Sequence, residues 1–249
     1  MLPLTLAIIA RDEADRIAAA IASVPGCAEV LVLDSGSVDT TLEVARSHGA
    51  RVVETDWPGH VAQKNRALEA ATQPWVLSLD ADERLSPEAL DAVRGAIEGG
   101  SAAGFALQRR NHWLGRPLRG GSFGPAWHLR LVRREAARWG GEDPHDKLAV
   151  EGRVERLDGF LEHHPYRSLG EHLSTIDRYS ARFVERSLEQ GRRASVLDLL
   201  VRPPWHLLRS YVLQGGFRDG VAGLLVAWLG ATHVALKWGR LLLARVSDS

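Results

Sequence analysis

The sequence predicts an α/β protein with a mostly parallel sheet, covered by helices on both faces, and a helical C-terminal segment. Two observations predict this fold class. Before Gly104, short apolar runs alternate with stretches of helical periodicity, which is typical of parallel strands joined by crossover helices. After Ser168 the chain looks helical almost to its end. We therefore expect two domains, a sheet domain over residues 1–167 and a helical one over residues 168–249.

The first half of the chain is predicted to contain four strands, each followed by a helix. The strands cover residues 4–9, 29–34, 50–54 and 75–79, and the first three helices cover residues 12–24, 40–48 and 61–71. A fourth helix should begin after Ser86, with Ser86 as its cap and Pro87 at its first position. After Gly104 the pattern changes to strands at residues 105–109, 128–133, 153–157 and 160–163, with a glycine-rich loop at 115–124.

The composition indicates a globular protein kept in a reducing compartment. Of its 249 residues, 45% are hydrophobic and 25% are charged, which excludes a disordered chain. The 31 basic and 31 acidic residues cancel, which argues against a nucleic-acid binder. Cys27 is the only cysteine, so the chain has neither a disulfide framework nor a cysteine zinc site. The N-terminus lacks the pattern of an export signal, and we expect a cytoplasmic protein.

The apolar run at residues 75–79 is followed by three carboxylates within four positions, Asp80, Asp82 and Glu83. Ligands of open α/β sheets bind at the carboxyl ends of the strands, so we expect the chemistry at Asp80 and Asp82. In an extended chain these two side chains leave on the same side and could share one divalent cation. Ligation by oxygen favours Mg²⁺ or Mn²⁺ over zinc. The alternative is helix capping, but Ser86 can fill that role.

Asp34 ends the second predicted strand and should lie at the same edge of the sheet as Asp80. An ionised carboxylate only accepts hydrogen bonds, so Asp34 could bind the imide hydrogen of a uracil or a ribose hydroxyl. The alternative is a turn residue, because Asp is common before Ser-Gly. The turn from Arg11 to Glu13 is a weaker signal, since acidic residues in a first helical turn are stabilised by the helix dipole without any ligand.

Lys64 lies near the start of the predicted helix at residues 61–71 and could face the same edge of the sheet. A helix start attracts anions through its free amides, and an ammonium adds a charge that could hold a diphosphate. The alternative is a solvated helical surface, where most lysines lie.

Together these motifs resemble the GT-A fold glycosyltransferases of family 2. The chain shares with that family, in order, residues 8–13 (IIARDE), 34–41 (DSGSVDTT), 63–65 (QKN) and 79–83 (LDADE). Within the family it looks most like the lipopolysaccharide core glycosyltransferases related to the inner-core β-glucosyltransferase. Residues 127–131 (WHLRL) and 144–148 (PHDKL) carry that closer resemblance, which covers nearly the whole chain.

The resemblance implies roles for individual residues. It implies a nucleotide-sugar site formed by Ala10, Arg11, Glu13, Asp34, Lys64, Asp80 and Ala81. It implies a divalent metal, Mg²⁺ or Mn²⁺, held by Asp82 with Asp80. It also implies a later carboxylate that takes the proton of the acceptor hydroxyl, so that transfer inverts the anomeric carbon.

Asp146 is the favoured base, although this chain departs from the subfamily at that point. The subfamily usually has His-Glu where this chain has His145 and Asp146, and the base could instead be Glu142 or Asp143. The alternative for Asp146 is a loop salt bridge with Lys147 or Arg153. A third metal ligand stays open among the histidines His128, His145, His163 and His164.

The C-terminal segment combines basic, aromatic and apolar residues. From residue 192 to residue 245 there are eight basic residues and two acidic ones. The apolar run at residues 221–236 is shorter than the roughly 20 residues that cross a bilayer, so we expect helices lying in the membrane interface. Trp205, Trp228 and Trp238 should then lie at headgroup level. The alternative is a buried helical core or a homodimer contact.

Together with the resemblance, these observations favour an inverting glycosyltransferase. Its donor is a nucleotide sugar, with a UDP-hexose favoured, and its acceptor is a lipid-linked saccharide such as the lipopolysaccharide inner core. It should work on the inner face of the cytoplasmic membrane, bound to its anionic surface. Two alternatives are a sugar nucleotidyltransferase and a non-catalytic interaction module on a decayed transferase fold. The first should carry a glycine-rich phosphate loop after the first strand, and residues 10–13 (ARDE) contain no glycine.

Overall fold

The computed structural model describes residues 1–142 and 145–246, without the side chains of Glu142, His145, Arg245 and Val246. The chain divides into two compact units. Unit 1 comprises residues 1–109 and 126–163, and unit 2 comprises residues 110–125 and 164–249.

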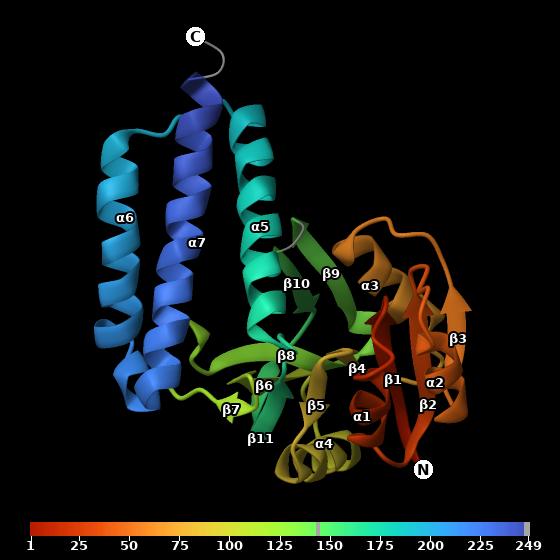
Figure 1. Cartoon of the computed structure of the whole chain (residues 1–249). Helices are drawn as coiled ribbons and strands as arrows, with labels where there is room; N and C mark the ends of the chain where they lie inside the picture. Colours follow the sequence, from red (N-terminus) through yellow and green to blue (C-terminus); the bar gives the residue numbers. More distant parts are fainter. Residues whose placement is uncertain (143–144, 247–249) are drawn as a thin grey trace. The chain divides into compact units, whose positions relative to one another are not determined.

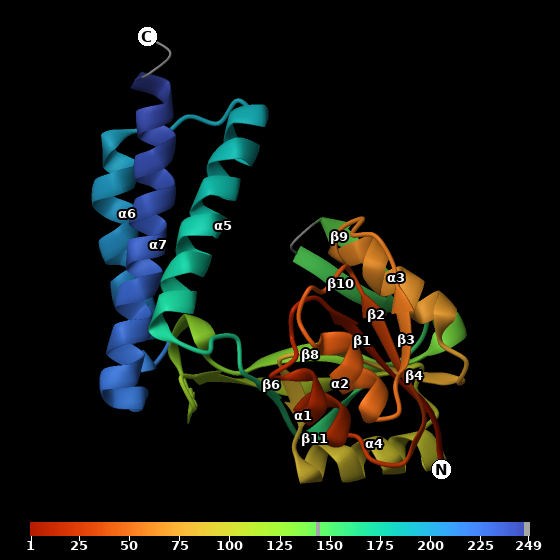
Figure 2. The same ribbon diagram turned by 45° about the vertical axis from the view of Figure 1, so that its right-hand side comes forward.

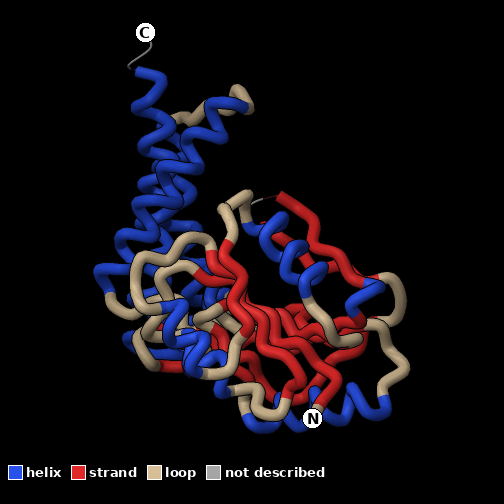
Figure 3. Tube along the Cα trace, turned by 90° about the vertical axis from the view of Figure 1, so that its right-hand side faces the viewer, coloured by secondary structure: helices blue, strands red, loops and turns tan. Residues whose placement is uncertain are grey.

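Unit 1 is built on a mixed sheet whose strands are labelled in Figure 1 and drawn red in Figure 3. Its strand order is β3-β2-β1-β4-β8-β6-β11-β5. The first four strands are parallel, as the alternation of strand and helix predicts: β1 (Leu2–Ala10), β2 (Cys27–Asp34), β3 (Arg51–Glu54) and β4 (Trp75–Asp80). Then come β8 (Ala126–Arg133), antiparallel to β4, β6 (Gly104–Trp113), antiparallel to β8, and β11 (Val154–His163), with β5 (Glu83–Leu85) antiparallel to β11.

The second half of the sheet differs from the sequence prediction in two places. Residues 153–157 and 160–163 were predicted as two strands but form the single strand β11, with Gly159 at a φ of 84° inside it. Gly159 lets this strand pass close to a helix, because a Cβ atom there would lie 2.2 Å from the backbone nitrogen of Ala89. The three-residue strand β5 was not predicted, since so short a run has no readable periodicity.

Helices cover both faces of the sheet, as predicted. Alternate residues of β1 divide between two cores: Leu4, Leu6 and Ile8 pack on one face and Ala7 on the other. The first core is closed by α1 (Ile17–Ala22) and α4 (Pro87–Gly99), with Ala45 of α2 (Thr41–Ser47). The second is closed by α3 (His60–Ala70). Ser86 caps α4 by accepting the N–H of Ala89, which confirms the predicted cap.

A hairpin of β9 (Ala137–Glu142) and β10 (His145–Val150) forms a second, two-stranded sheet. Its strands pair antiparallel, with Asp146 opposite Gly141 and Leu148 opposite Trp139. Trp139 is buried in the second core of unit 1 and Leu148 packs against that core. The hairpin was missed in the sequence, because residues 137–142 have neither alternating polarity nor β-branched side chains.

Unit 2 consists mainly of three helices that lie side by side in both Figure 1 and Figure 2: α5 (Leu169–Glu189), α6 (Val196–Leu208) and α7 (Gly220–Val246). A π turn (Arg209–Leu213) and a 3₁₀ turn (Gly216–Asp219) join α6 to α7. The predicted glycine-rich loop packs on this junction. A Cβ atom at Gly120 would lie 2.3 Å from the carbonyl oxygen of Gly215, so that position requires glycine.

Candidate active site

The register of the parallel strands brings the predicted carboxylates to one edge of the sheet. Ala10, at the end of β1, is paired with Asp34 of β2, and Ile9 is paired with Asp80 of β4. Asp34 and Asp80 therefore flank the end of the central strand, as parallel strands ending at one edge predict.

Asp34 is almost fully buried and shapes the loop that follows it. Its Oδ2 accepts the backbone N–H of Gly36 at 2.9 Å and of Ser37 at 2.8 Å, and its Oδ1 accepts the hydroxyl of Ser37. Gly36 has a φ of 83°, which glycine adopts without strain. The carboxylate thus forms the turn that the sequence alternative describes.

The loop after β1 is fastened to the loop after β2. Asp12 donates its N–H to the Ser37 hydroxyl at 2.9 Å and accepts the N–H of Val38 at 2.8 Å. Glu13 donates its N–H to the hydroxyl of Thr41 at 2.8 Å. Asp12 has a φ of 55°, outside helical geometry, so the predicted helix start at residue 12 is wrong and α1 begins at Ile17. The Arg11 side chain is 60% exposed at this edge.

Three consecutive residues of α3 reach three different parts of unit 1. Gln63 is buried and donates to the hydroxyls of Ser35 and Thr55 at 3.0 and 2.7 Å. Lys64 turns towards the sheet edge, and Asn65 binds the backbone of β9. Successive helical residues point about 100° apart, which lets this triplet join the loops, the edge and the hairpin.

Lys64 is buried rather than solvated, so the helical-surface alternative is wrong. Its Nζ lies 3.0 Å from Oδ1 of Asp80 and 2.9 Å from Oδ2 of Asp146. It also lies 4.5 Å from the centre of the Trp139 ring. Burial alone would lower the pKa of Lys64, but the carboxylates of Asp80 and Asp146 outweigh this effect and raise it.

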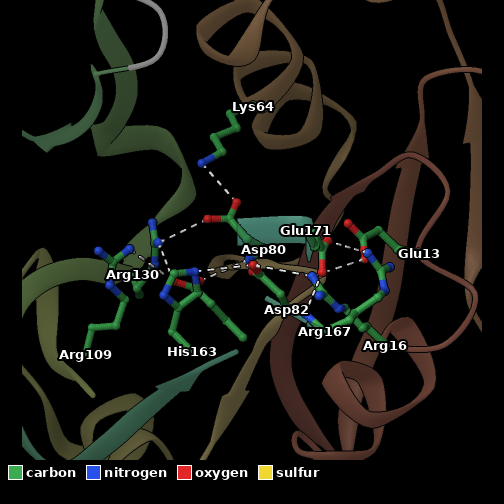
Figure 4. Close-up of polar contacts among 11 residues, drawn as sticks. Glu13, Arg16, Lys64, Asp80, Asp82, Arg109, Arg130, His163, Arg167 and Glu171 are labelled. Atoms are coloured by element: carbon green, nitrogen blue, oxygen red, sulfur yellow. Dashed lines mark hydrogen bonds and ion pairs between the residues drawn. The ribbon is translucent and has the colours of Figure 1, made fainter. Parts of the chain in front are cut away.

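Asp80 is held between two cations, as Figure 4 shows. Besides Lys64, it contacts the Nη2 of Arg130 at 3.4 Å. Its partial burial favours the neutral acid, yet Lys64 and Arg130 outweigh that effect and hold the pKa of Asp80 below its ordinary value. Asp80 is therefore ionised at neutral pH.

Asp82 has different partners from Asp80. The chain turns at residues 81 and 82 instead of continuing extended, so the expectation that the two aspartates leave on the same side is wrong. The Oδ2 of Asp82 lies 3.3 Å from Nε2 of His163 and 3.9 Å from the guanidinium of Arg16 (Figure 4). Arg16 also lies 3.8 Å from the carboxylate of Glu13.

Glu83 and Arg130 form a buried ion pair that sequence reasoning gave no role. Glu83 is fully buried, and its Oε1 lies 2.8 Å from Arg130 and 3.9 Å from Arg109. Its Oε2 accepts the N–H of Asp80 at 3.0 Å. Glu83 thereby closes the turn after β4, and Arg130 bridges it to Asp80. The signal available in the sequence was a third carboxylate beside Asp80, which needs a cation if it is buried.

Of the three candidates for the base, Asp146 is the one whose side chain the structure describes. Asp143 and the side chain of Glu142 lie outside the described residues. The ion pair of Asp146 is with Lys64, 82 positions away in the chain, and not with Lys147 or Arg153 as the alternative held. Arg153 instead pairs with Glu155 at 3.1 Å.

The histidines considered as third metal ligands lie in different surroundings. His163 lies beside Asp82, whereas His164 belongs to unit 2 and stacks on His112. Burial and the nearby Arg109 and Arg130 lower the pKa of His128 to about 3, so this histidine is neutral. The side chain of His145 lies outside the described residues.

The residues at this edge fit a divalent ion only in part. Within the described residues, no group of three or more His, Cys, Asp and Glu side chains is arranged to hold a metal. Asp82 and His163 nevertheless offer one oxygen and one nitrogen side by side. Such a pair suits an ion that takes its other ligands from substrate phosphates and water.

Comparison with known proteins identifies the family. Residues 5–145 match the family model described as Glycosyl transferase family 2. The chain belongs to glycosyl transferase family 2. It is 31% identical over 245 residues to the lipopolysaccharide core biosynthesis glycosyltransferase LpsC of Rhizobium meliloti, an alignment that covers 94% of this chain and 90% of LpsC. The predicted family is confirmed.

One solved structure agrees on the fold, and a second is reported beside it. A crystal structure of a mycobacterial protein, 21% identical, aligns with a TM-score of 0.50 over 68% of this chain and 69% of its own. Glucosyl-3-phosphoglycerate synthase from Mycobacterium tuberculosis, solved with Mn²⁺, UDP and glucosyl-3-phosphoglycerate, aligns at 21% identity with a TM-score of 0.40, over 54% of this chain and 58% of its own. This chain thus spans little more than half of that protein. The predicted α/β fold of the GT-A class is confirmed.

Proposed function

We propose that this family 2 enzyme transfers a hexosyl group from a nucleotide sugar to a lipid-linked saccharide of the lipopolysaccharide core. The favoured donor is a UDP-hexose, and the transfer inverts the configuration of the anomeric carbon. The observation that carries the proposal is the convergence of Asp34, Asp80, Asp82 and Asp146 at one edge of unit 1, each with defined polar partners. The relative LpsC, named for lipopolysaccharide core biosynthesis, supports the acceptor class. Family membership favours this function over a nucleotidyltransferase or a decayed module.

The donor nucleotide would bind at the joined loops after β1 and β2. Asp34 holds the second loop, and the Arg11 side chain and the Glu13 carboxylate flank the first. The side chains of Ala10 and Ala81 pack in the first core, so these two residues would contribute their backbone to the site beside Asp80. The Lys64 ammonium has three N–H groups, of which two face Asp80 and Asp146. The ring of Trp139 lies 4.5 Å from the ammonium, so these two carboxylates, rather than the diphosphate, are the partners that we assign to Lys64.

A divalent ion, Mg²⁺ or Mn²⁺, would be held by Asp82 with His163, with Asp80 as the neighbouring acid. When bound, it would neutralise charge that develops on the diphosphate as the sugar leaves. Two arginines would also stabilise negative charge on the diphosphate. Arg16 lies 3.9 Å from Asp82, and Arg130 lies 3.4 Å from Asp80. The buried position of Arg130 makes its charge effective, because water screens it little.

The acceptor hydroxyl would be activated by Asp146. The hydroxyl oxygen forms a bond to the anomeric carbon, the bond from that carbon to the diphosphate breaks, and the proton passes to the Asp146 carboxylate. The products are a lengthened saccharide with inverted configuration and a nucleoside diphosphate. The Asp146 side chain is 14% exposed, so it remains reachable from solvent.

The helical unit would hold the enzyme at an anionic membrane surface, on the inner face of the cytoplasmic membrane. Apolar side chains at spacings of three or four residues stay exposed on α6, at Leu197, Val201 and Trp205, and on α7, at Val221, Leu225 and Trp228. Arg192, Arg193, Arg209 and Arg218 lie exposed near the ends of these helices. Basic residues flanking an apolar surface suit anionic headgroups above an acyl layer.

Two details of the membrane prediction change. Trp238 is buried against Phe183, with the guanidinium of Arg202 over its ring, and is therefore not at headgroup level. The segment from Gly216 to Ala244 is by length and composition alone long enough to cross a membrane, so the shortness of the run at 221–236 does not exclude crossing. Exposed Trp205 and Trp228 support the interfacial arrangement.

The membrane proposal is tested with vesicles. Replacing Trp205 and Trp228 together by Ser should abolish pelleting with vesicles of anionic lipid, while Trp57→Ser, an exposed tryptophan of unit 1, should leave it unchanged. Pelleting that survives the double substitution would contradict the proposal. Loss of a dimer in the double variant, with no vesicle binding by the unaltered protein, would assign the surface to a homodimer.

The transfer itself is tested with a panel of nucleotide sugars and Mn²⁺, by thermal shift and by release of nucleoside diphosphate. A ligand that binds only the folded protein raises its melting temperature. UDP-hexoses should give the largest shift. Asp146→Asn should then lower kcat by roughly 100-fold or more with nearly normal donor binding, as expected for a general base. Unchanged turnover in this variant would reassign the base to Glu142 or Asp143.

A further inference from the structure

The candidate base is carried by a hairpin that forms a sheet of its own. β9 and β10 pair only with each other among the described strands, and Asp146 lies on β10. The position of Asp146 relative to the edge of the main sheet therefore depends on how the hairpin is fastened to the rest of unit 1.

Asn65 of α3 fastens the hairpin backbone. Its side-chain Nδ2 donates to the carbonyl oxygen of Trp139 at 2.9 Å, and its Oδ1 accepts the N–H of Trp139 at 2.9 Å. The amide thus makes the two hydrogen bonds that a neighbouring strand would make. Trp139 is buried, so the loss of these partners would leave two backbone groups unsatisfied.

Lys64 fastens the carboxylate itself. Its ammonium bridges Asp146 of the hairpin, at 2.9 Å, and Asp80 at the end of β4, at 3.0 Å. The Trp139 ring covers it at 4.5 Å, and its side chain is only 6% exposed. A buried ammonium requires such partners, which makes this contact well defined, unlike a surface ion pair.

We propose that Lys64 is a positioning residue for the base: it fixes the Asp146 carboxylate relative to Asp80, while Asn65 fixes the hairpin that carries it. The inference rests on the proposed function of Asp146. Lys64 donates to Oδ2 of Asp146, so Oδ1 is the oxygen that takes the acceptor proton. The proton moves from the acceptor hydroxyl to Oδ1 as the new glycosidic bond forms and the bond to the diphosphate breaks.

The test compares kcat, the KM values and UDP affinity of the full-length, metal-loaded enzyme for Lys64→Met, Lys64→Arg and Asn65→Ala. Lys147→Met, on the same hairpin but exposed, is the control. Lys64→Met should lower kcat by about 100-fold while UDP affinity changes less than about 10-fold, since an effect on the base acts in the transition state. Lys64→Arg, which keeps the charge, should recover part of kcat. Lys147→Met should change neither.

A double-mutant cycle with Asp146→Asn separates positioning from donor binding. If Lys64 acts through Asp146, Lys64→Met should slow the Asp146→Asn enzyme little further, because the step it serves is already lost. Multiplied losses would overturn the inference, as would a loss of UDP affinity equal to the whole loss of kcat/KM.

Asn65→Ala tests the role of the hairpin separately, including the case in which Lys64→Met does not fold. It removes no charge and should lower kcat about 10-fold with unchanged UDP affinity, because a displaced base costs rate rather than binding. Unchanged kcat in Asn65→Ala would overturn the role of the hairpin anchor. Failure of the proposed function has a different signature, since the unaltered enzyme would then release no nucleoside diphosphate from any nucleotide sugar.

Discussion

The two units bury polar groups in opposite ways. Unit 1 buries charges in pairs: Glu83, Arg130 and Lys64 are each less than 10% exposed, and each has a partner of opposite sign. Unit 2 instead buries histidines with lowered pKa values and leaves large apolar side chains on its outside. Paired charges suit a site that binds a phosphorylated substrate, while exposed apolar stripes suit a surface that meets lipid.

The largest expected loss of stability comes from removing one partner of a buried ion pair in unit 1. Arg130→Met leaves the fully buried Glu83 without its nearest cation and should lower the free energy of unfolding by about 3–5 kcal/mol, measured by urea denaturation. The control is Arg46→Met. Arg46 and Glu54 form an ion pair in which both side chains are exposed, so this substitution should lower the free energy of unfolding by less than about 1 kcal/mol. Equal losses in the two variants would show that burial does not matter here.

The next effect concerns the histidines of unit 2. Burial, followed by the nearby His233, lowers the pKa of His172 to about 4, and burial, followed by Lys237 and His206, lowers that of His233 to about 4. The unfolded chain binds protons at an ordinary pKa of about 6.5, so it takes up more protons than the folded chain between these values. Stability is therefore complete above pH 6.5 and declines as the pH falls towards 4.

This acid sensitivity should cost on the order of 1–2 kcal/mol per histidine at pH 5 relative to pH 7. Urea denaturation followed by helical circular dichroism at the two pH values measures it. His233→Leu removes one of the titrating groups and should reduce the difference between the two pH values. The same difference in this variant would show that His233 titrates alike in the folded and unfolded chain.

The smallest expected effect concerns the exposed apolar residues of unit 2. Trp205→Ser should change the free energy of unfolding by less than about 1 kcal/mol, since this side chain is 52% exposed. Trp238→Ala, in the buried cluster with Phe183, should cost about 3–5 kcal/mol. A loss for Trp205→Ser as large as that for Trp238→Ala, measured in thermal melts, would mean that Trp205 is part of a core.

The sequence predicted the parts of the site that depend on local pattern. Asp34 and Asp80 could be placed together because a parallel strand that ends in a carboxylate carries it to the edge of the sheet. The Ser86 cap was predictable for the same reason, since a cap and its partner lie three residues apart.

The remaining parts depend on contacts between distant residues. Lys64 and Asp146 lie 82 positions apart, and Arg130 and Glu83 lie 47 apart, so no periodicity links them. Asp80 and Asp82 are separated by a turn, which the Glu83 carboxylate closes by accepting the backbone N–H of Asp80. Trp205 and Trp238 look alike in the sequence, and only the packing of α5, α6 and α7 decides which of them is buried.

The most direct measurement of the donor site is isothermal titration of UDP into the unaltered protein and into Asp82→Ala, with and without Mn²⁺. Asp82 lies at the sheet edge with a 20% exposed side chain, so its removal should leave the fold intact, which a thermal melt confirms. The unaltered protein should bind UDP more tightly with Mn²⁺ than without, and Asp82→Ala should lose that gain. UDP binding that gains equally from Mn²⁺ in both proteins would contradict a metal-assisted donor site at Asp82.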